Sequence, residues 1–154
     1  IIPLDYLVTL QKKLEQTGTD NQIYLASKEM GYRWFKNMYE YFKIKPEDVT
    51  KWGVRILSLA GWGETIFVDV DLKGEKLMVK VKNAAQAKKY GTSNHPVDYF
   101  IRGCYASGAT VLFGKDCHCI ETSCAANGAD FCEFIAQPIE RFGKEDPSIL
   151  RQLL

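Results

Sequence analysis

The sequence lacks long hydrophobic runs, a surplus of charge of one sign and the closely spaced cysteine pairs of a zinc finger. No apolar run approaches the roughly 18 to 20 residues that a bilayer-spanning helix needs, so we expect no membrane span. The formal net charge at pH 7 is +1. Such a balance provides no field to hold nucleic acid, and we expect no direct nucleic-acid partner. No nucleotide-binding signature is present either, which disfavours an enzyme that transfers hydride from a nucleotide.

What the sequence contains is ordinary for one globular domain. Its 154 residues suit a single domain over 1–154, because such a length buries a sizeable core. It begins without methionine, so we expect it to be trimmed or to be a piece of a longer protein. Five cysteines are an odd number, and four of them lie between positions 117 and 132. Secreted disulfide scaffolds normally spread an even number along a shorter chain, so we expect a cytoplasmic protein with reduced thiols.

Helical spacing of apolar residues dominates residues 1–63. The pattern predicts a first helix that ends at Gly18 and a second between Asp20 and the stretch before Pro46. A third helix should begin at Pro46 and end at Gly61. The aromatic and basic segment at 31–42 is expected to turn its rings toward the core, since it holds too few basic residues for nucleic acid.

The second part of the chain alternates with period 2. Residues 66–82 predict a β-hairpin, and strands over 116–124 and 130–139 predict another. Between them, 97–114 reads as a helix rich in small residues, and a short terminal helix should follow at 146–154. We therefore expect an α+β domain in which helices cover one face of an antiparallel sheet made of two hairpins.

The second hairpin gathers residues that could bind a metal. Side chains two apart on a strand share a face, so Cys119 and Glu121 should lie together. The turn brings Cys124 and Cys132 close, and two thiolates with a carboxylate can bind Zn²⁺. Two alternatives stay open: a thiol-based redox cluster that includes Cys104, Cys117 and Cys119, or buried cysteines that serve as small apolar side chains. His118 and His95 are interpreted as ordinary packed or loop residues.

Over residues of about 50–137 the sequence resembles the 4-vinyl-reductase domain family. The resemblance is carried by Gly61-Trp62-Gly63, Asn83-Ala84, Arg102-Gly103, Gly108, Phe113-Gly114, the run from Glu121 to Cys124, Gly128 and the run from Cys132 to Phe134. It implies a ligand-binding fold related to vesicle-tethering subunits that hold a lipid chain in an apolar cavity. Members of the family include sensor halves of activators that respond to phenols and of archaeal redox-responsive repressors. Despite the name, the family does not imply a reductase.

The resemblance also implies a structural zinc ion. Phenol-sensing members bind zinc through three cysteines and a glutamate, and three of these positions fall on Glu121, Cys124 and Cys132. The fourth falls on Asp98, where this sequence departs from the family pattern. A carboxylate oxygen is still a legitimate zinc ligand, although the set should be less selective than one with three thiolates.

The implied apolar pocket should lie between the sheet and the helices. Residues expected to line it, each equally suited to an ordinary core, are Trp52, Trp62, Phe67, Tyr99 and Tyr105. The function favoured at this point is a small-molecule binding or sensor domain with structural zinc. A thiol-based redox sensor is the alternative, and a reductase of tetrapyrrole metabolism comes third. We also expect a homodimer, from the family and from the small residues at 103–109.

Overall fold

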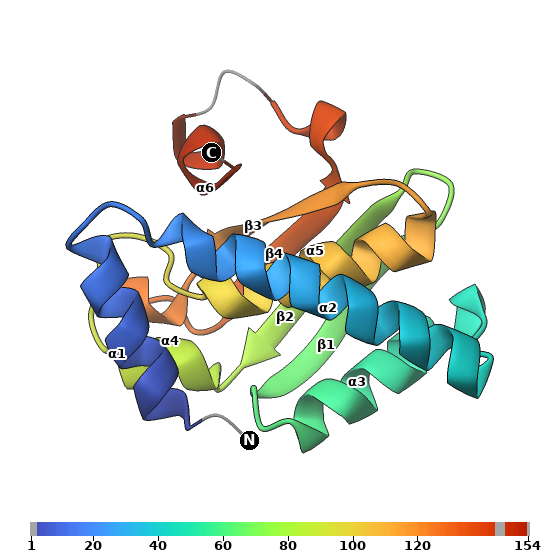
Figure 1. Cartoon of the computed structure of the whole chain (residues 1–154), viewed down its shortest axis with the longest axis horizontal. Coiled ribbons are helices and arrows are strands. Elements are labelled where there is room, and N and C mark those ends of the chain that lie inside the picture. The colour runs from blue at the N-terminus through green and yellow to red at the C-terminus, as the bar shows by residue number, and fades with distance from the viewer. Residues whose placement is uncertain (1–2, 144–146, 154) are drawn as a thin grey trace.

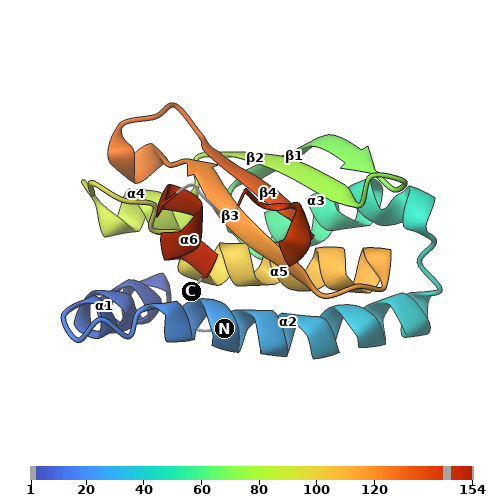
Figure 2. The ribbon, with the colours of Figure 1, turned by 90° about the horizontal axis from the view of Figure 1, so that it is seen from above.

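The structure is a computed structural model, and it describes residues 3–143 and 147–153. A four-stranded sheet, the helix α5 (Tyr99–Phe113) and the helix α2 (Asn21–Phe42) lie in three successive layers (Figure 2). The other helices are α1 (Leu4–Glu15), α3 (Val49–Leu59), α4 (Ala85–Tyr90) and α6 (Pro147–Leu153). The strands are β1 (Glu64–Asp71), β2 (Lys76–Lys82), β3 (Cys117–Ser123) and β4 (Cys132–Pro138).

The sheet joins the two predicted hairpins along a single seam. Its order is β1-β2-β4-β3, and every neighbouring pair is antiparallel. Alternate side chains of β2 and β4 point into the core: Leu77, Val79 and Val81 are buried on β2, and Phe134 and Ala136 on β4. The helix α5 lies directly against that face, and α2 packs on the other side of α5 (Figure 1). The predicted α+β class and antiparallel sheet are confirmed.

Close contact between α2 and α5 accounts for the small residues of α5. A β-carbon built on Gly103 would lie 2.6 Å from the carbonyl oxygen of Tyr24, so only glycine fits there. Gly31 of α2 faces Ser107 in the same way, and α2 continues through Gly31 without a break. The small residues thus serve packing within the chain. The homodimer stays a prediction from the resemblance alone, which sedimentation would decide.

Two expectations about the first helices need correction. The third helix does not begin at Pro46: a single 3₁₀ turn occupies Pro46–Asp48, and α3 begins at Val49. The aromatic segment at 31–42 turns only part of its rings inward. Tyr32, Trp34 and Tyr41 are 42%, 44% and 81% exposed. A 22-residue helix that packs on one neighbour leaves its far side in solvent, whatever residues it carries.

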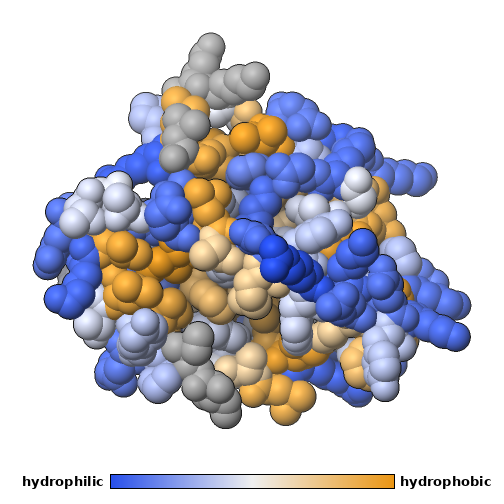
Figure 3. All heavy atoms as spheres, viewed as in Figure 1, coloured by the Kyte–Doolittle hydropathy of each residue, from blue (hydrophilic) through white to orange (hydrophobic). Residues whose placement is uncertain are grey.

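The surface that contains α2 is mixed in character. Apolar groups alternate with hydrophilic ones on this face and form no single continuous patch (Figure 3). Among the residues that the structure describes, none of the helices is both long enough and apolar enough to cross a membrane.

Candidate functional site

Three of the four predicted metal ligands converge at the second hairpin. Glu121 lies on β3, Cys124 follows that strand and Cys132 begins β4. One ligand atom from each lies within 4.8 Å of the other two, and all three residues are buried. The turn between them closes because the amides of Asn127 and Ala129 both donate to the carbonyl oxygen of Cys124. The cluster therefore has a donor set and spacing that could hold a metal ion.

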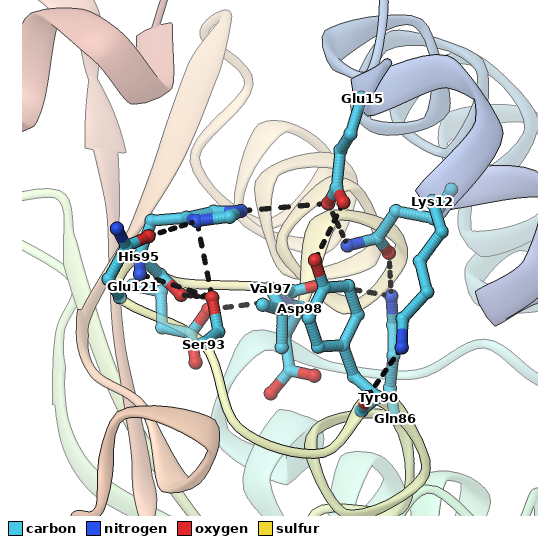
Figure 4. Close-up of polar contacts among 11 residues, drawn as sticks. Lys12, Glu15, Gln86, Tyr90, Ser93, His95, Val97, Asp98 and Glu121 are labelled. Atoms are coloured by element: carbon cyan, nitrogen blue, oxygen red, sulfur yellow. Dashed lines mark hydrogen bonds and ion pairs between the residues drawn. The ribbon is translucent and has the colours of Figure 1, made fainter.

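Asp98, the fourth predicted ligand, lies immediately before α5 and is 1% exposed. It stands outside the tight group of three, although its backbone amide donates to Glu121 Oε2 at 3.0 Å (Figure 4). Neither of its carboxylate oxygens accepts a hydrogen bond from a described residue, and neither does Glu121 Oε1. Buried polar atoms normally have partners, because leaving one unpaired costs about 1–3 kcal/mol. Three such oxygens beside two thiols fit a bound cation.

The electrostatics of this cluster point the same way. Burial raises the pKa of Asp98 well above its usual value, and the neighbouring Glu121 carboxylate raises it further. Burial and the nearby Cys124 raise the pKa of Glu121. The hydrogen bond from Cys132 lowers the pKa of Cys124 to about 6, while that of Cys132 is raised by the same contact. Without a cation, these four groups cannot all be ionised together.

Of the remaining cysteines, Cys117 and Cys119 are packed in the core and Cys104 is half-buried. All five thiols are free. Burial raises the pKa of Cys104 to about 11 and that of Cys117 to about 12, which makes both poor nucleophiles. Cys119 faces the core beside Glu121 as predicted, but it does not belong to the metal-ligand group. His118 packs against Tyr24, whose hydroxyl lies 3.2 Å from Nδ1.

A polar network fixes the loop that carries Asp98 (Figure 4). Gln86 of α4 donates to the carbonyl oxygen of Val97 at 3.1 Å and to Gln11 of α1 at 2.7 Å. His95 Nε2 lies 3.6 Å from Glu15 Oε1 on α1. The amide of Ser93 donates to the carbonyl oxygen of Ala126, which ties this loop to the cysteine-bearing turn. The loop is thus held from α1, from α4 and from the turn itself.

Two residues of this region were not predicted from the sequence as functional residues. Arg102 is 2% exposed, and its guanidinium lies 4.7 Å and 5.0 Å from the ring centres of Tyr24 and Tyr99. It donates from Nη1 to Gln152 Oε1 at 2.8 Å and from Nη2 to the Gln152 carbonyl at 3.0 Å. Arg102 was visible only as part of the family pattern, and nothing in the local sequence singled out Gln152.

An apolar cavity lies at the other end of the molecule. Its volume is about 40 Å³, and it lies where α2, α3 and α5 meet the sheet. Trp52, Phe67 and Tyr105, three of the five predicted lining residues, border it. Trp62 instead stacks on Phe100 with ring centres 4.8 Å apart. Tyr99 borders a separate groove of about 380 Å³ between α6 and the loop at 94–96.

This cavity is smaller than the family resemblance led us to expect. Ligand pockets usually measure about 300–1,000 Å³. Side chains of α2, α3 and α5 line the void closely, and Gly53 lets the Phe67 ring approach α3 so closely that a β-carbon there would lie 2.6 Å from the ring. The region is therefore a nearly complete core with a small void.

Residues 77–138 match the model of the 4-vinyl-reductase domain. The expected resemblance to this family is thus confirmed over that segment. The matched segment begins at β2, later than the expected start near residue 50, and ends with β4. The matched segment contains all four predicted metal ligands, whereas Trp52 and Phe67 lie before it. No curated protein matches the chain significantly by sequence.

Solved structures share the fold of this chain, including the helices before the matched segment. The phenol-responsive sensory domain of the transcription activator PoxR, solved with phenol, matches with a TM-score of 0.75 and 16% identity over 98% of this chain and 82% of that one. A vinyl-4-reductase family protein from Methanocaldococcus jannaschii matches with a TM-score of 0.61 and 20% identity, over 90% and 83%. Trafficking protein particle complex subunit 3 from Naegleria fowleri, covalently bound to palmitic acid, gives 0.54 and 10%, over 87% and 93%. Identities of this size show a common fold alone.

Proposed function

We propose that this protein is a sensor or carrier module that binds an apolar or aromatic small molecule. The observation that carries the proposal is the apolar cavity bordered by Trp52, Phe67 and Tyr105. The fold is that of a sensory domain solved with phenol, which gives the chemical class of the first ligand to try. A ligand would enter beneath the sheet, where it would contact aromatic rings and the Cys104 thiol.

Binding requires the cavity to widen. A cavity of about 150 Å³ accommodates benzene in an apolar core, and the volume here is about 40 Å³. The Phe67 ring, pressed against Gly53, and the helix α3 behind it border this space, so their displacement would enlarge it. Ligand binding would then be linked to a shift of α3 against β1.

Phenol is the probe that tests this function. Isothermal titration calorimetry should show binding in the low-micromolar range. Ile56 of α3 borders the cavity, so Ile56→Phe should fill it and weaken binding at least about tenfold, or about 1.4 kcal/mol. Leu59→Phe, the same kind of change at a site on α3 that is 89% exposed, should leave the affinity unchanged. Absence of binding to the parent protein at millimolar phenol would contradict the proposal, as would equal affinities of the two variants.

The module also holds structural zinc through Asp98, Glu121, Cys124 and Cys132. The support is a set of three buried oxygens that lie beside two thiols and find no hydrogen-bond partner among the residues the structure describes. Zinc accepts such a mixed oxygen and sulfur set, and four protein ligands leave no position for a catalytic water. Zinc would fasten the second hairpin to the loop before α5. This role is structural and leaves the apolar cavity to the ligand.

Removal of one thiolate tests the zinc site. Structural zinc supplies about 10 kcal/mol or more of folding free energy in small domains, so Cys124→Ser should release metal and lower the melting temperature by more than about 10 °C. Cys117→Ser, a buried thiol outside the cluster, should keep the metal. Metal analysis of the purified proteins and thermal unfolding measure both effects.

The second candidate function is a thiol-based redox sensor. Its support is the pair of Cys124 and Cys132, in which the pKa of Cys124 falls to about 6 because Cys132 donates to it. A peroxide could oxidise this thiolate to a sulfenic acid, and Cys132 would then displace water to form a disulfide. If the parent protein contains no zinc and Cys124→Ser melts like the parent, this candidate replaces the zinc site.

A further inference from the structure

The outer edge of β3 is covered by side chains from three different helices. The amide of Cys117 donates to Thr110 Oγ1 at 3.0 Å, and that of Cys119 donates to the Tyr24 hydroxyl at 3.2 Å. The third outward amide, that of Glu121, donates to Gln152 Oε1 at 2.8 Å. α5, α2 and α6 thus each satisfy one of these donors, and the contact from α6 falls on a candidate metal ligand.

Gln152 makes two hydrogen bonds to the backbone of Glu121, whereas Thr110 and Tyr24 each accept one from β3. Besides accepting from the Glu121 amide, it donates from Nε2 to the Glu121 carbonyl oxygen at 3.1 Å. Its side-chain amide therefore pairs with both backbone groups of Glu121, as the next strand of a sheet would. The same Oε1 atom accepts from Arg102 Nη1 at 2.8 Å. Gln152 is 8% exposed, so these bonds form in a buried setting.

We propose that Gln152 is a positioning residue for the metal site, and that docking of α6 is coupled to occupancy of that site. The inference rests on the metal site proposed above. Gln152 fixes the backbone of Glu121 and so directs its carboxylate toward Cys124 and Cys132. Partners of this kind orient a ligand before the metal arrives, and their loss typically lowers metal affinity about 10- to 100-fold.

Charge strengthens the coupling. Two carboxylates and two thiolates carry more negative charge than a divalent cation neutralises, which leaves the loaded cluster anionic. Arg102 is the buried cation next to the cluster, and Gln152 supplies two oxygens that hold its guanidinium. Loss of the Gln152 side chain removes one of these oxygens together with both bonds to Glu121. One residue of α6 thus supports the position of a ligand and the position of the compensating charge.

Coupling between two sites is reciprocal. If a docked α6 tightens metal binding, then bound metal must hold α6 on β3 by the same factor. Stripping the metal should therefore loosen residues 147–153. The C-terminal helix would then report the state of a site buried beneath it.

The experiment compares Gln152→Ala with Arg151→Ala in the full chain. Arg151 is the neighbouring residue of α6 and is exposed, so its loss controls for any change to the helix itself. Co²⁺ affinity is measured by competition with a chelator, and the Co²⁺ absorption spectrum reports the ligand geometry. Gln152→Ala should bind Co²⁺ about 10- to 100-fold more weakly with an altered spectrum, and Arg151→Ala should stay within about twofold of the parent.

Two further measurements complete the test. Gln152→Glu keeps the acceptor for Glu121 and Arg102, but it sets a carboxylate oxygen against the Glu121 carbonyl oxygen and adds negative charge beside an anionic cluster, so it should also bind Co²⁺ more weakly than the parent. Hydrogen exchange of amides 151–153 in the parent should quicken when the metal is removed, and this response should be smaller in Gln152→Ala. Equal Co²⁺ affinity of the parent and Gln152→Ala overturns the inference while the metal site stands. A parent that binds no Co²⁺ or Zn²⁺ overturns both.

Discussion

The two ends of α5 set opposite requirements for a partner. At its N-terminal end, Asp98 and Glu121 are buried beside two thiols, and three of their oxygens accept no hydrogen bond from the described part of the chain. Toward its C-terminal end, apolar side chains leave a void of only about 40 Å³. The two regions lie toward opposite sides of the molecule, one beside α4 and the other beside α3 (Figure 1). The polar end is incomplete without a cation, whereas the apolar end is nearly complete and must open for a ligand.

The largest expected effect is a pH dependence of stability that comes from the polar end of α5. In metal-free protein the folded pKa values of Asp98 and Glu121 are raised above their unfolded values near 4. The folded state then binds more protons, so the stability that these two carboxyls contribute is full below about pH 4 and is lost as pH rises through their raised folded pKa values. The slope is about 1.4 kcal/mol per pH unit for each proton. Urea unfolding at several pH values between about 4.5 and 6 measures it.

Zinc and amide substitution provide the controls for this slope. Metal-loaded protein should gain stability over the same range, since its ligands must lose protons to bind. In the metal-free double variant Asp98→Asn, Glu121→Gln, the unfolding free energy should no longer decrease over this pH range. The range stays below about 6, where Cys124 titrates with the opposite sign because its pKa is lowered. A metal-free parent and double variant with parallel profiles would show that these carboxyls are not the source.

Substitutions at two glycines test how tightly the apolar end is packed. Gly53→Ala places a methyl group 2.6 Å from the Phe67 ring and should destabilise the protein by about 1–3 kcal/mol. Gly108 borders the same cavity, but its β-carbon would lie 3.7 Å from Phe35 at ordinary contact distance. Gly108→Ala should therefore stabilise by about 0.5–1 kcal/mol through helix propensity. Equal effects in urea unfolding would mean that the void is distributed differently.

Much of the fold followed from local patterns. Alternation predicted both hairpins, and glycine and proline marked the helix ends within a few residues. The approach of Cys124 to Cys132 also followed, because a short turn leaves the chain little choice. Asp98 came only from the family resemblance, since no local rule links a residue before a helix to a strand 23 positions later.

The missed features depend on contacts between distant elements. Gln152 meets Glu121 and Arg102 only after α6 has docked, and an amide side chain carries no pattern that foretells its partner. The exposed rings of Tyr32 and Trp34 follow from the single neighbour of α2, which a sequence does not state. The size of the cavity depends on side-chain shapes at the scale of one ring, as at Gly53 and Phe67.

The order of the sheet leaves two strands with an open side, and each is protected differently against pairing with another molecule. β1 carries a bulge between Phe67 and Asp69 and exposes acidic residues such as Asp71, features that discourage the addition of a strand. On β3, side chains of Thr110, Tyr24 and Gln152 already occupy the outward amides. Departure of α6 would therefore do more than free a helix: it would uncover a place on β3 where a foreign strand could pair, the usual first step toward aggregation.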